Sequence, residues 1–274
     1  MPKKNLSSSG QTGPLSVGNV VSASLRIYRD HFKSYFGLAL VTYLWLLIPI
    51  YGWAKYSAIS APISRLAFGE VSEEPETVSD AYREVNPGMW SFLWAGILTS
   101  LIFFGVCLVG GIAMAIVAVG AVAIFAKNSL IIGSLVIVAV IAFLIIYIRI
   151  LSRLLIVELP LAIEDIDASS AISRSWELTK GSVGRIQWIV FVAFLISLPL
   201  YIVSNLLSLL LQNVLTTRLG AQSSLFSLVY IILSLGQTIC FGALLTPFWQ
   251  VIKAIIYYDL RSRKEGLGLQ IRKR

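Results

Sequence analysis

Five stretches of this chain contain no aspartate, glutamate, lysine or arginine, and each is long enough to cross a membrane. About 20 apolar residues suffice for a membrane-spanning helix. A backbone in lipid must satisfy its own hydrogen bonds, so these stretches should be helical. The run Leu135–Ile148 also lacks the alternation of a membrane β-strand. The sequence therefore predicts an all-α, polytopic helical membrane protein. The stretches are residues 34–54, 85–126, 128–148, 186–217 and 219–252.

The charge content excludes several function classes. Only 13% of the 274 residues are charged, against roughly 25% in soluble domains. The net charge of +8 comes from basic residues beside the apolar runs, which indicates contacts with anionic lipid headgroups and no nucleic acid. Cys107 and Cys240 lie within apolar runs, so neither a disulfide nor a zinc site is expected. Nucleotide-binding and hydrolase motifs are absent. We expect no enzyme, no catalytic residue, no metal and no cofactor.

The chain divides into three parts. Residues 1–15 are predicted to be a disordered N-terminal tail, because they are polar and rich in serine and glycine. Residues 16–264 form a single helical membrane domain. Residues 265–274 form a basic C-terminal tail.

An amphipathic helix is predicted over Val17–Lys33, with Ser16 as its N-cap. Arg26, Arg29 and Lys33 follow one another at helical spacing and share its polar stripe. A basic amphipathic helix ahead of a membrane span should lie among lipid headgroups.

A second amphipathic helix is predicted over Asp167–Lys180, with Ala168, Ile172 and Trp176 on its apolar side. Arg174 and Glu177 are three residues apart on its other side and are expected to pair. Glu164, Asp165 and Asp167 also suggest a metal site. Capping is the favoured interpretation, because aspartate is a preferred N-cap residue and no histidine or cysteine joins them.

About six transmembrane helices are predicted. The segments beginning at Val17, Thr77 and Asp167 each precede a long apolar run. They suggest a threefold repeat of an amphipathic helix plus a helical hairpin. A rival count leaves residues 54–69 at the surface and folds residues 85–126 as a hairpin around Gly105–Gly111. The spans are Tyr35–Trp53, 54–69, Trp90–Val117, Leu130–Val157, Ile186–Gln212 and Leu225–Ile256.

The basic residues predict an orientation. With six spans, all of the 22 lysines and arginines except Lys55, Lys127 and Arg218 lie on one side. That side should be cytoplasmic and should hold both termini. Membrane lipids with anionic headgroups, and a protein partner, are the expected partners there. The candidate cytoplasmic interaction surface comprises Arg26, Arg29, Lys33, Arg174, Trp176, Glu177, Lys180, Arg261, Arg263 and Lys264.

Three segments resemble a known family. They are LSVGNVVSASLRIYRDHFKSYFGLAL from Leu15, LPLAIEDIDASSAISRSWELTKGSVGRI from Leu159 and TPFWQVIKAIIYYDLRSRKEGL from Thr246. They are similar to the bacterial membrane domain of glycerophosphoryl diester phosphodiesterases, and most of all to its cyanobacterial-type stand-alone members. The resemblance implies the membrane part without the catalytic domain. It also implies a bacterial plasma membrane or, in a cyanobacterium, a thylakoid membrane.

Three functions remain open at this stage. The first is a non-enzymatic membrane module that organises lipids or partner proteins. The second is a transporter or channel-like protein for a small solute or lipid, with Asn205, Gln212 and Gln237 along its path. The third is a lipid-modifying enzyme that would need His31, Glu158, Glu164 and Asp165 to converge.

Overall fold

A computed structural model describes residues 16–125, 128–220 and 223–266, and this part of the chain is helical without strands. The all-α prediction is confirmed. The predicted tail over 1–15 and residues 267–274 of the predicted tail over 265–274 lie outside the described residues. The elements are α1 (Val17–Asp30), α2 (Phe32–Trp45), α3 (Tyr51–Ile59), α4 (Ala61–Val71), α5 (Val78–Val85), the 3-10 helix η1 (Asn86–Gly88), α6 (Met89–Phe125), α7 (Ser129–Leu154), α8 (Glu158–Ile163), α9 (Ala168–Thr179), α10 (Val183–Leu219) and α11 (Ser224–Glu265).

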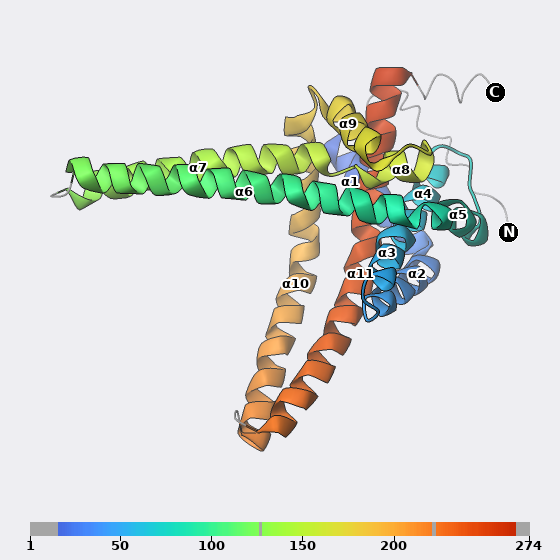
Figure 1. Cartoon of the computed structure of the whole chain (residues 1–274). Coiled ribbons are helices and arrows are strands. Elements are labelled where there is room, and N and C mark those ends of the chain that lie inside the picture. Colours follow the sequence, from blue (N-terminus) through green and yellow to red (C-terminus); the bar gives the residue numbers. More distant parts are fainter. Residues whose placement is uncertain (1–15, 126–127, 221–222, 267–274) are drawn as a thin grey trace.

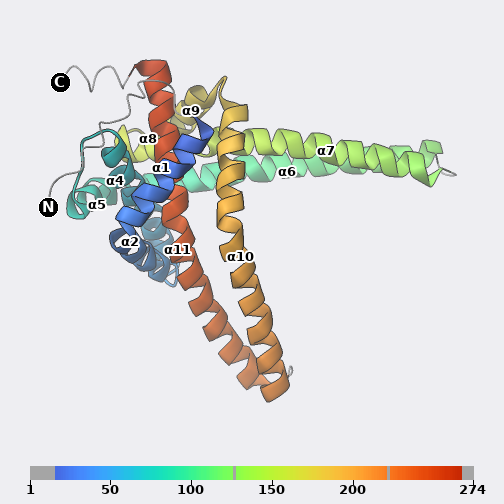
Figure 2. The same cartoon turned by 180° about the vertical axis from the view of Figure 1, so that it is seen from behind.

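The short helices gather into one body from which two long helical hairpins project (Figure 1). We call this body the hub; it contains α1–α5, α8 and α9 together with the adjoining ends of the long helices. The α6/α7 hairpin and the α10/α11 hairpin leave the hub in different directions, as the reverse view also shows (Figure 2).

Four segments are long and apolar enough to cross a membrane: Val78–Phe125, Ser129–Ile163, Val183–Leu219 and Ser224–Glu265. Their apolar side chains are exposed along the hairpins; Val109 is 68% exposed and Ile124 is 74% exposed. An apolar surface of this extent is typical of contact with lipid. The last four predicted spans are therefore found where the sequence placed them.

The first predicted span, Tyr35–Trp53, is wrong because the helix breaks. Helix α2 ends at Trp45, and α3 begins only at Tyr51. Pro49 lies in the break; it has no N–H to donate and disfavours a helical conformation in the residue before it. With 14 residues, α2 is about 21 Å long, shorter than the roughly 30 Å of a bilayer core.

Residues 54–69 do not form a span either. They belong to α3 and α4, which meet at Ser60, and Ala58, Ala61, Ile63 and Ala67 are buried in the hub. The structure thus describes four helices of membrane-spanning length and not six.

Six spans would place Lys55 and the connector, residues 70–89, on opposite sides of the membrane, but Lys55 packs against this connector. Its side chain is only 7% exposed and donates a hydrogen bond to Asn86 Oδ1. The Lys55 ammonium also lies 5.8 Å from the ring centroid of Tyr51 and 5.9 Å from that of Tyr82. Aromatic faces attract a cation in this way. The turn that carries Lys55 is therefore packed against the connector.

The rival hairpin around Gly105–Gly111 is also excluded, because α6 runs unbroken from Met89 to Phe125. Gly110 lies against α7 at this point. A Cβ on Gly110 would come within 2.1 Å of the Phe143 ring. The glycine allows α6 and α7 to pack closely.

Two helix ends differ from the prediction. Ser16 caps α1 by accepting a hydrogen bond from Asn19 N at 3.2 Å, as predicted. However, α1 ends at Asp30, and Lys33 belongs to α2. The predicted span Leu130–Val157 extends beyond the helix that forms it, because α7 ends at Leu154. Pro160 lies within the short helix α8.

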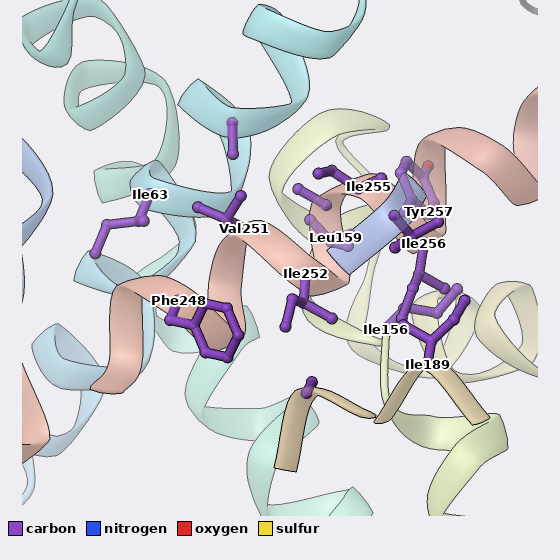
Figure 3. Packing of buried hydrophobic residues seen from close by; sticks show 14 of the residues in the cluster. Ile63, Ile156, Leu159, Ile189, Phe248, Val251, Ile252, Ile255, Ile256 and Tyr257 are labelled. Carbon is purple, nitrogen blue, oxygen red and sulfur yellow. The ribbon is translucent and has the colours of Figure 1, made fainter. Parts of the chain in front are cut away.

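The core of the hub surrounds α11. This helix contacts α1, α2, α4, α8, α9 and α10. Ile252, Ile255, Ile256 and Tyr257 are buried on successive faces (Figure 3). A helix that is apolar on every face requires neighbours on every side. The packing of α11 therefore positions α1, α2, α4, α8 and α9.

Gly52→Ala should destabilise the turn between α2 and α3. A Cβ at Gly52 would lie 1.9 Å from the Trp45 carbonyl oxygen, so the backbone must shift, at a cost of about 1–3 kcal/mol. Gly37→Ala is the control, because nothing lies within 4 Å of its added Cβ; it should stabilise α2 by up to about 1 kcal/mol. Thermal unfolding of the purified protein in detergent measures both changes. Equal melting temperatures for the two variants would contradict the turn geometry.

Candidate functional site

Each of three short helices in the hub begins with a side-chain cap. Ser16 caps α1, and Thr77 caps α5 by accepting a hydrogen bond from Asp80 N at 3.2 Å. Asp167 caps α9 by accepting from Ser169 N at 3.2 Å and from Ser170 N. The carboxylate of Asp167 is thus used by the helix, as the capping interpretation predicted.

The three capped helices bury the same positions. The fourth residue after the cap has no exposed surface in any of them: Val20 in α1, Ala81 in α5 and Ala171 in α9. The eighth residue after the cap is buried as well: Ser24, Val85 and Ser175. Residues four apart share one face of a helix, so each helix turns the same face inward. A capping residue followed four and eight positions later by a buried residue is a sequence signal that the sequence analysis missed.

The apolar side predicted for α9 is confirmed only in part, because Ala168 is buried and Ile172 packs against the core, but Trp176 does not. Trp176 is 43% exposed, and the buried face runs through Ala171, Ser175 and Leu178. Ser175 Oγ donates a hydrogen bond to the Arg153 carbonyl at 2.7 Å, which requires close approach of α9 to α7. Small side chains permit this approach. Trp176 packs under the Arg153 guanidinium instead, 4.4 Å from it.

An ionic cluster joins α8, α9 and the end of α11. Arg174 donates to both carboxylate oxygens of Glu164, with Nε–Oε2 at 2.9 Å and Nη2–Oε1 at 3.1 Å. It also pairs with Glu265, and Arg261 Nε lies 2.8 Å from Glu265 Oε2. The Tyr257 hydroxyl donates to Glu164. The predicted pair of Arg174 with Glu177 is therefore wrong, because Arg174 reaches across to other helices.

Two more cations of the predicted surface are held within the chain. Arg263 pairs with Asp259 at 3.0 Å, and Lys264 Nζ donates to the Glu177 carbonyl at 2.7 Å. Arg185 also reaches the Asp259 carboxylate, at 3.1 Å. These contacts fix the end of α11 against α9 and the start of α10.

The other cations of the predicted surface face outward. Arg26, Lys33 and Lys180 are exposed, and no described carboxylate lies within ion-pair distance of them. We call these three the exposed cations. Arg29 lies 3.3 Å from Asp30, and both are highly exposed, so this pair contributes little stability.

Three of the four residues named for a lipid-modifying enzyme have separate partners. Glu158 pairs with Lys253 at 2.8 Å, His31 lies 3.3 Å from Glu70, and Glu164 belongs to the ionic cluster. Across residues 16–125, 128–220 and 223–266, no three histidine, cysteine, aspartate or glutamate side chains gather as a metal site would require.

The polar residues predicted along a transport path form local bonds. Gln237 Nε2 donates to the Ser204 carbonyl at 2.6 Å and to Ser208 Oγ at 2.7 Å, which ties α11 to α10. Asn205 Nδ2 donates to Tyr201 of its own helix at 2.8 Å. Gln212 is exposed.

Sequence reasoning missed two hydroxyl-lined cavities, of about 400 and 460 Å³, at the junction of the hairpins. Both lie against α3 and α11. Residues from separate helices build them, so no local pattern marks them. Tyr56, Thr246, Gln250 and Lys253 line both cavities.

Comparison of the chain with family models, with curated proteins and with solved structures gave no match in any of the three. The resemblance to the membrane domain of glycerophosphoryl diester phosphodiesterases stays a prediction from the sequence. The function must be inferred from the geometry of the chain itself.

Arg174→Lys should destabilise the hub by about 1–2 kcal/mol. Lysine cannot reproduce the two-pronged contact with Glu164, and the cluster is largely shielded, with Glu164 only 18% exposed. Thermal unfolding in detergent measures the loss. Lys180→Ala at the end of the same helix is the control and should change stability by less than about 0.5 kcal/mol. An unchanged melting temperature for Arg174→Lys would show that the cluster contributes no stability.

Stability should fall in acid through Asp167. Hydrogen bonds from Ser169 and Ser170 lower the pKa of Asp167 to about 2, below the roughly 3.9 of an unfolded chain. A depressed pKa adds stability above about pH 4, and this stability is lost as the pH falls towards 2. Asp167→Asn keeps an accepting oxygen but does not titrate.

Melting temperatures between pH 6 and pH 2.5 test this cap. The wild type should lose more stability than Asp167→Asn as the pH falls below 4. Parallel curves for the two proteins would show that the carboxylate charge does not support α9.

Proposed function

We propose that this protein is a non-enzymatic membrane module whose hub lies at the cytoplasmic membrane surface and organises anionic lipids or a protein partner there. One observation carries the proposal: the hub retains the exposed cations Arg26, Lys33 and Lys180 beside hairpins that present apolar side chains outward. Each cation near an anionic membrane contributes roughly 1 kcal/mol of attraction.

The distribution of basic residues supports a cytoplasmic hub. Among the lysines and arginines that the structure describes, only Arg218 lies at the end of a long hairpin away from the hub. The positive-inside rule then places the hub, with the first and last described helices, in the cytoplasm. Lys55 strengthens this assignment, because it belongs to the hub and not to the opposite side. The resemblance stated above suggests a bacterial plasma membrane or a thylakoid membrane.

We further infer a threefold repeat in which an amphipathic helix precedes a helical hairpin, with the first hairpin held within the hub. The matched caps and buried positions of α1, α5 and α9 support it, because each of these helices precedes a helical hairpin. The first hairpin, formed by α2 and α3, is shorter than the other two and packs against α11 and α6 in the hub. The long hairpins have length to spare: the 37 residues of α10 extend roughly 55 Å, so they cross a 30 Å core even when strongly tilted.

The observations favour this module over a transporter or channel-like protein. A transport path needs polar groups that face a continuous cavity. Asn205 and Gln237 instead bond to neighbouring backbone and hydroxyl groups, and neither residue lines the cavities at the hairpin junction.

Removing the exposed cations should weaken the preference for anionic lipid. The triple variant Arg26→Gln, Lys33→Gln, Lys180→Gln should lose up to about fivefold per charge, because each cation contributes roughly 1 kcal/mol. The measurement is the ratio of phosphatidylglycerol to phosphatidylcholine around the protein in mixed vesicles, determined by energy transfer from its tryptophans to labelled lipid.

Arg218→Gln is the control, because this exposed cation lies at the far end of α10. It should leave the ratio unchanged in the leaflet beside the hub. High salt should reduce the wild-type preference, since exposed charges are screened. A triple variant that keeps the wild-type ratio would overturn the proposal for lipids and direct the search to a protein partner.

A further inference from the structure

The two cavities at the hairpin junction form a composite polar site. The first, of about 400 Å³, lies among α2, α3, α10 and α11. The second, of about 460 Å³, lies among α3, α6, α7, α8 and α11. Each falls within the size range of small-molecule sites, roughly 300–1,000 Å³. The four residues common to both form the wall between them.

Hydroxyl groups dominate the polar lining. Tyr43 OH and Thr246 Oγ1 share a hydrogen bond of 3.0 Å at the first cavity. Serine and threonine side chains continue this lining in both cavities. The further hydroxyl residues are Tyr56, Ser57, Ser60, Thr99, Ser100, Tyr201, Ser204 and Thr238. Ser57, Ser60 and Thr238 already donate to nearby backbone carbonyls, so their oxygens are left to accept from the hydroxyl groups of a ligand.

Two side chains have hydrogen-bonding capacity left over. Gln250 Oε1 accepts a hydrogen bond from Ser64 Oγ at 2.9 Å, but no described residue accepts from its amide nitrogen. Trp249 lines the first cavity, and its indole Nε1 is buried without a hydrogen-bond partner among the described residues. A buried donor without an acceptor is costly. Of the two, the amide nitrogen of Gln250, which lines both cavities, can donate to an oxygen atom of a ligand.

The site carries no net charge. Lys253 contributes the cation of the wall, and it is already paired with Glu158 at 2.8 Å. An anionic group would bring a third charge without a counterion into a largely apolar surrounding, which is unfavourable. A zwitterion would have to separate the existing pair. A neutral polyol adds no charge and leaves the pair between Lys253 and Glu158 intact.

The surroundings require that such a ligand be amphiphilic. The junction lies between two hairpins whose outward side chains are apolar. Leu101 on α6 is 58% exposed, and Ile202 on α10 is 50% exposed. Acyl chains can lie along these surfaces while the head group occupies the junction. A free sugar would gain nothing from them.

We propose that the junction of the two hairpins binds the neutral, hydroxyl-rich head group of a membrane lipid, as in a glycosyl diacylglycerol. The proposal deepens the proposed function and rests on its premise that the protein organises lipids. The two proposals involve different side chains, because the exposed cations of the hub play no part in the junction.

Native mass spectrometry of the full chain tests the proposal. The protein is released from nanodiscs that contain equal amounts of monoglucosyl diacylglycerol, phosphatidylcholine and phosphatidylglycerol with identical acyl chains. The wild type should retain one glucolipid in preference to the other two. Thr246→Val and Tyr56→Phe should each lower its occupancy by about fivefold, because each removes one hydroxyl partner.

Thr217→Val and Tyr230→Phe are the matched controls. Both residues lie towards the far end of the α10/α11 hairpin and line neither cavity, and Thr217 bonds only within its own helix. They should keep wild-type occupancy. Melting temperatures of all four variants show that the chain is folded, so a loss of lipid is not a loss of structure.

Three outcomes would overturn the proposal: preferential retention of either phospholipid, retention of no lipid, or an equal loss in the control variants. The triple variant of the exposed cations separates this proposal from the proposed function. It should keep the glucolipid even where its preference for phosphatidylglycerol is lost. If the glucolipid is absent while that preference persists, the junction site alone is rejected.

Discussion

The structure depends on the burial of one segment of α11. From Val251 to Leu260 this helix has neighbours on almost every side, and the short helices of the hub supply them. Burying apolar surface from water stabilises by about 25 cal/mol per Å², but only at the hub, where water is the alternative. Further along the hairpins, an apolar side chain that is not buried contacts lipid instead of water. Burying the same residue types there therefore adds no such stabilisation. This difference accounts for a compact hub beside two hairpins with exposed apolar side chains.

The charged side chains follow the same division between the hub and the hairpins. Within the hub, cations and carboxylates from distant parts of the chain are paired, as Arg174 is with Glu164 and Glu265. These contacts orient α8 and α9 around the end of α11. The cations left outward, such as Lys33 and Lys180, lie on the same body. Paired and outward-facing charges thus lie close together, although the sequence presents them as one undivided basic surface.

The junction of the two hairpins differs from the apolar hub core and from the exposed hairpin surfaces, because it contains cavities lined by polar side chains. Helix α2 is too short to span a bilayer, so α2 and α3 end beside the long helices and leave cavities there. The polar side chains in these cavities come from helices that are far apart in sequence. Thr246, Gln250 and Lys253 resemble isolated polar residues in an apolar run when the chain is considered residue by residue.

Periodicity and composition by themselves determined the helical membrane class, the last four spans and the caps Ser16 and Asp167, because these depend on interactions within a few residues. Pro49 also stands in the sequence, but the prediction of a span over Tyr35–Trp53 did not take it into account. Only the tertiary structure decided the buried face of α9, the partners of Arg174 and the site around Lys253. Each of these depends on which helix lies opposite, and helical periodicity carries no information about a neighbour that is distant in the chain.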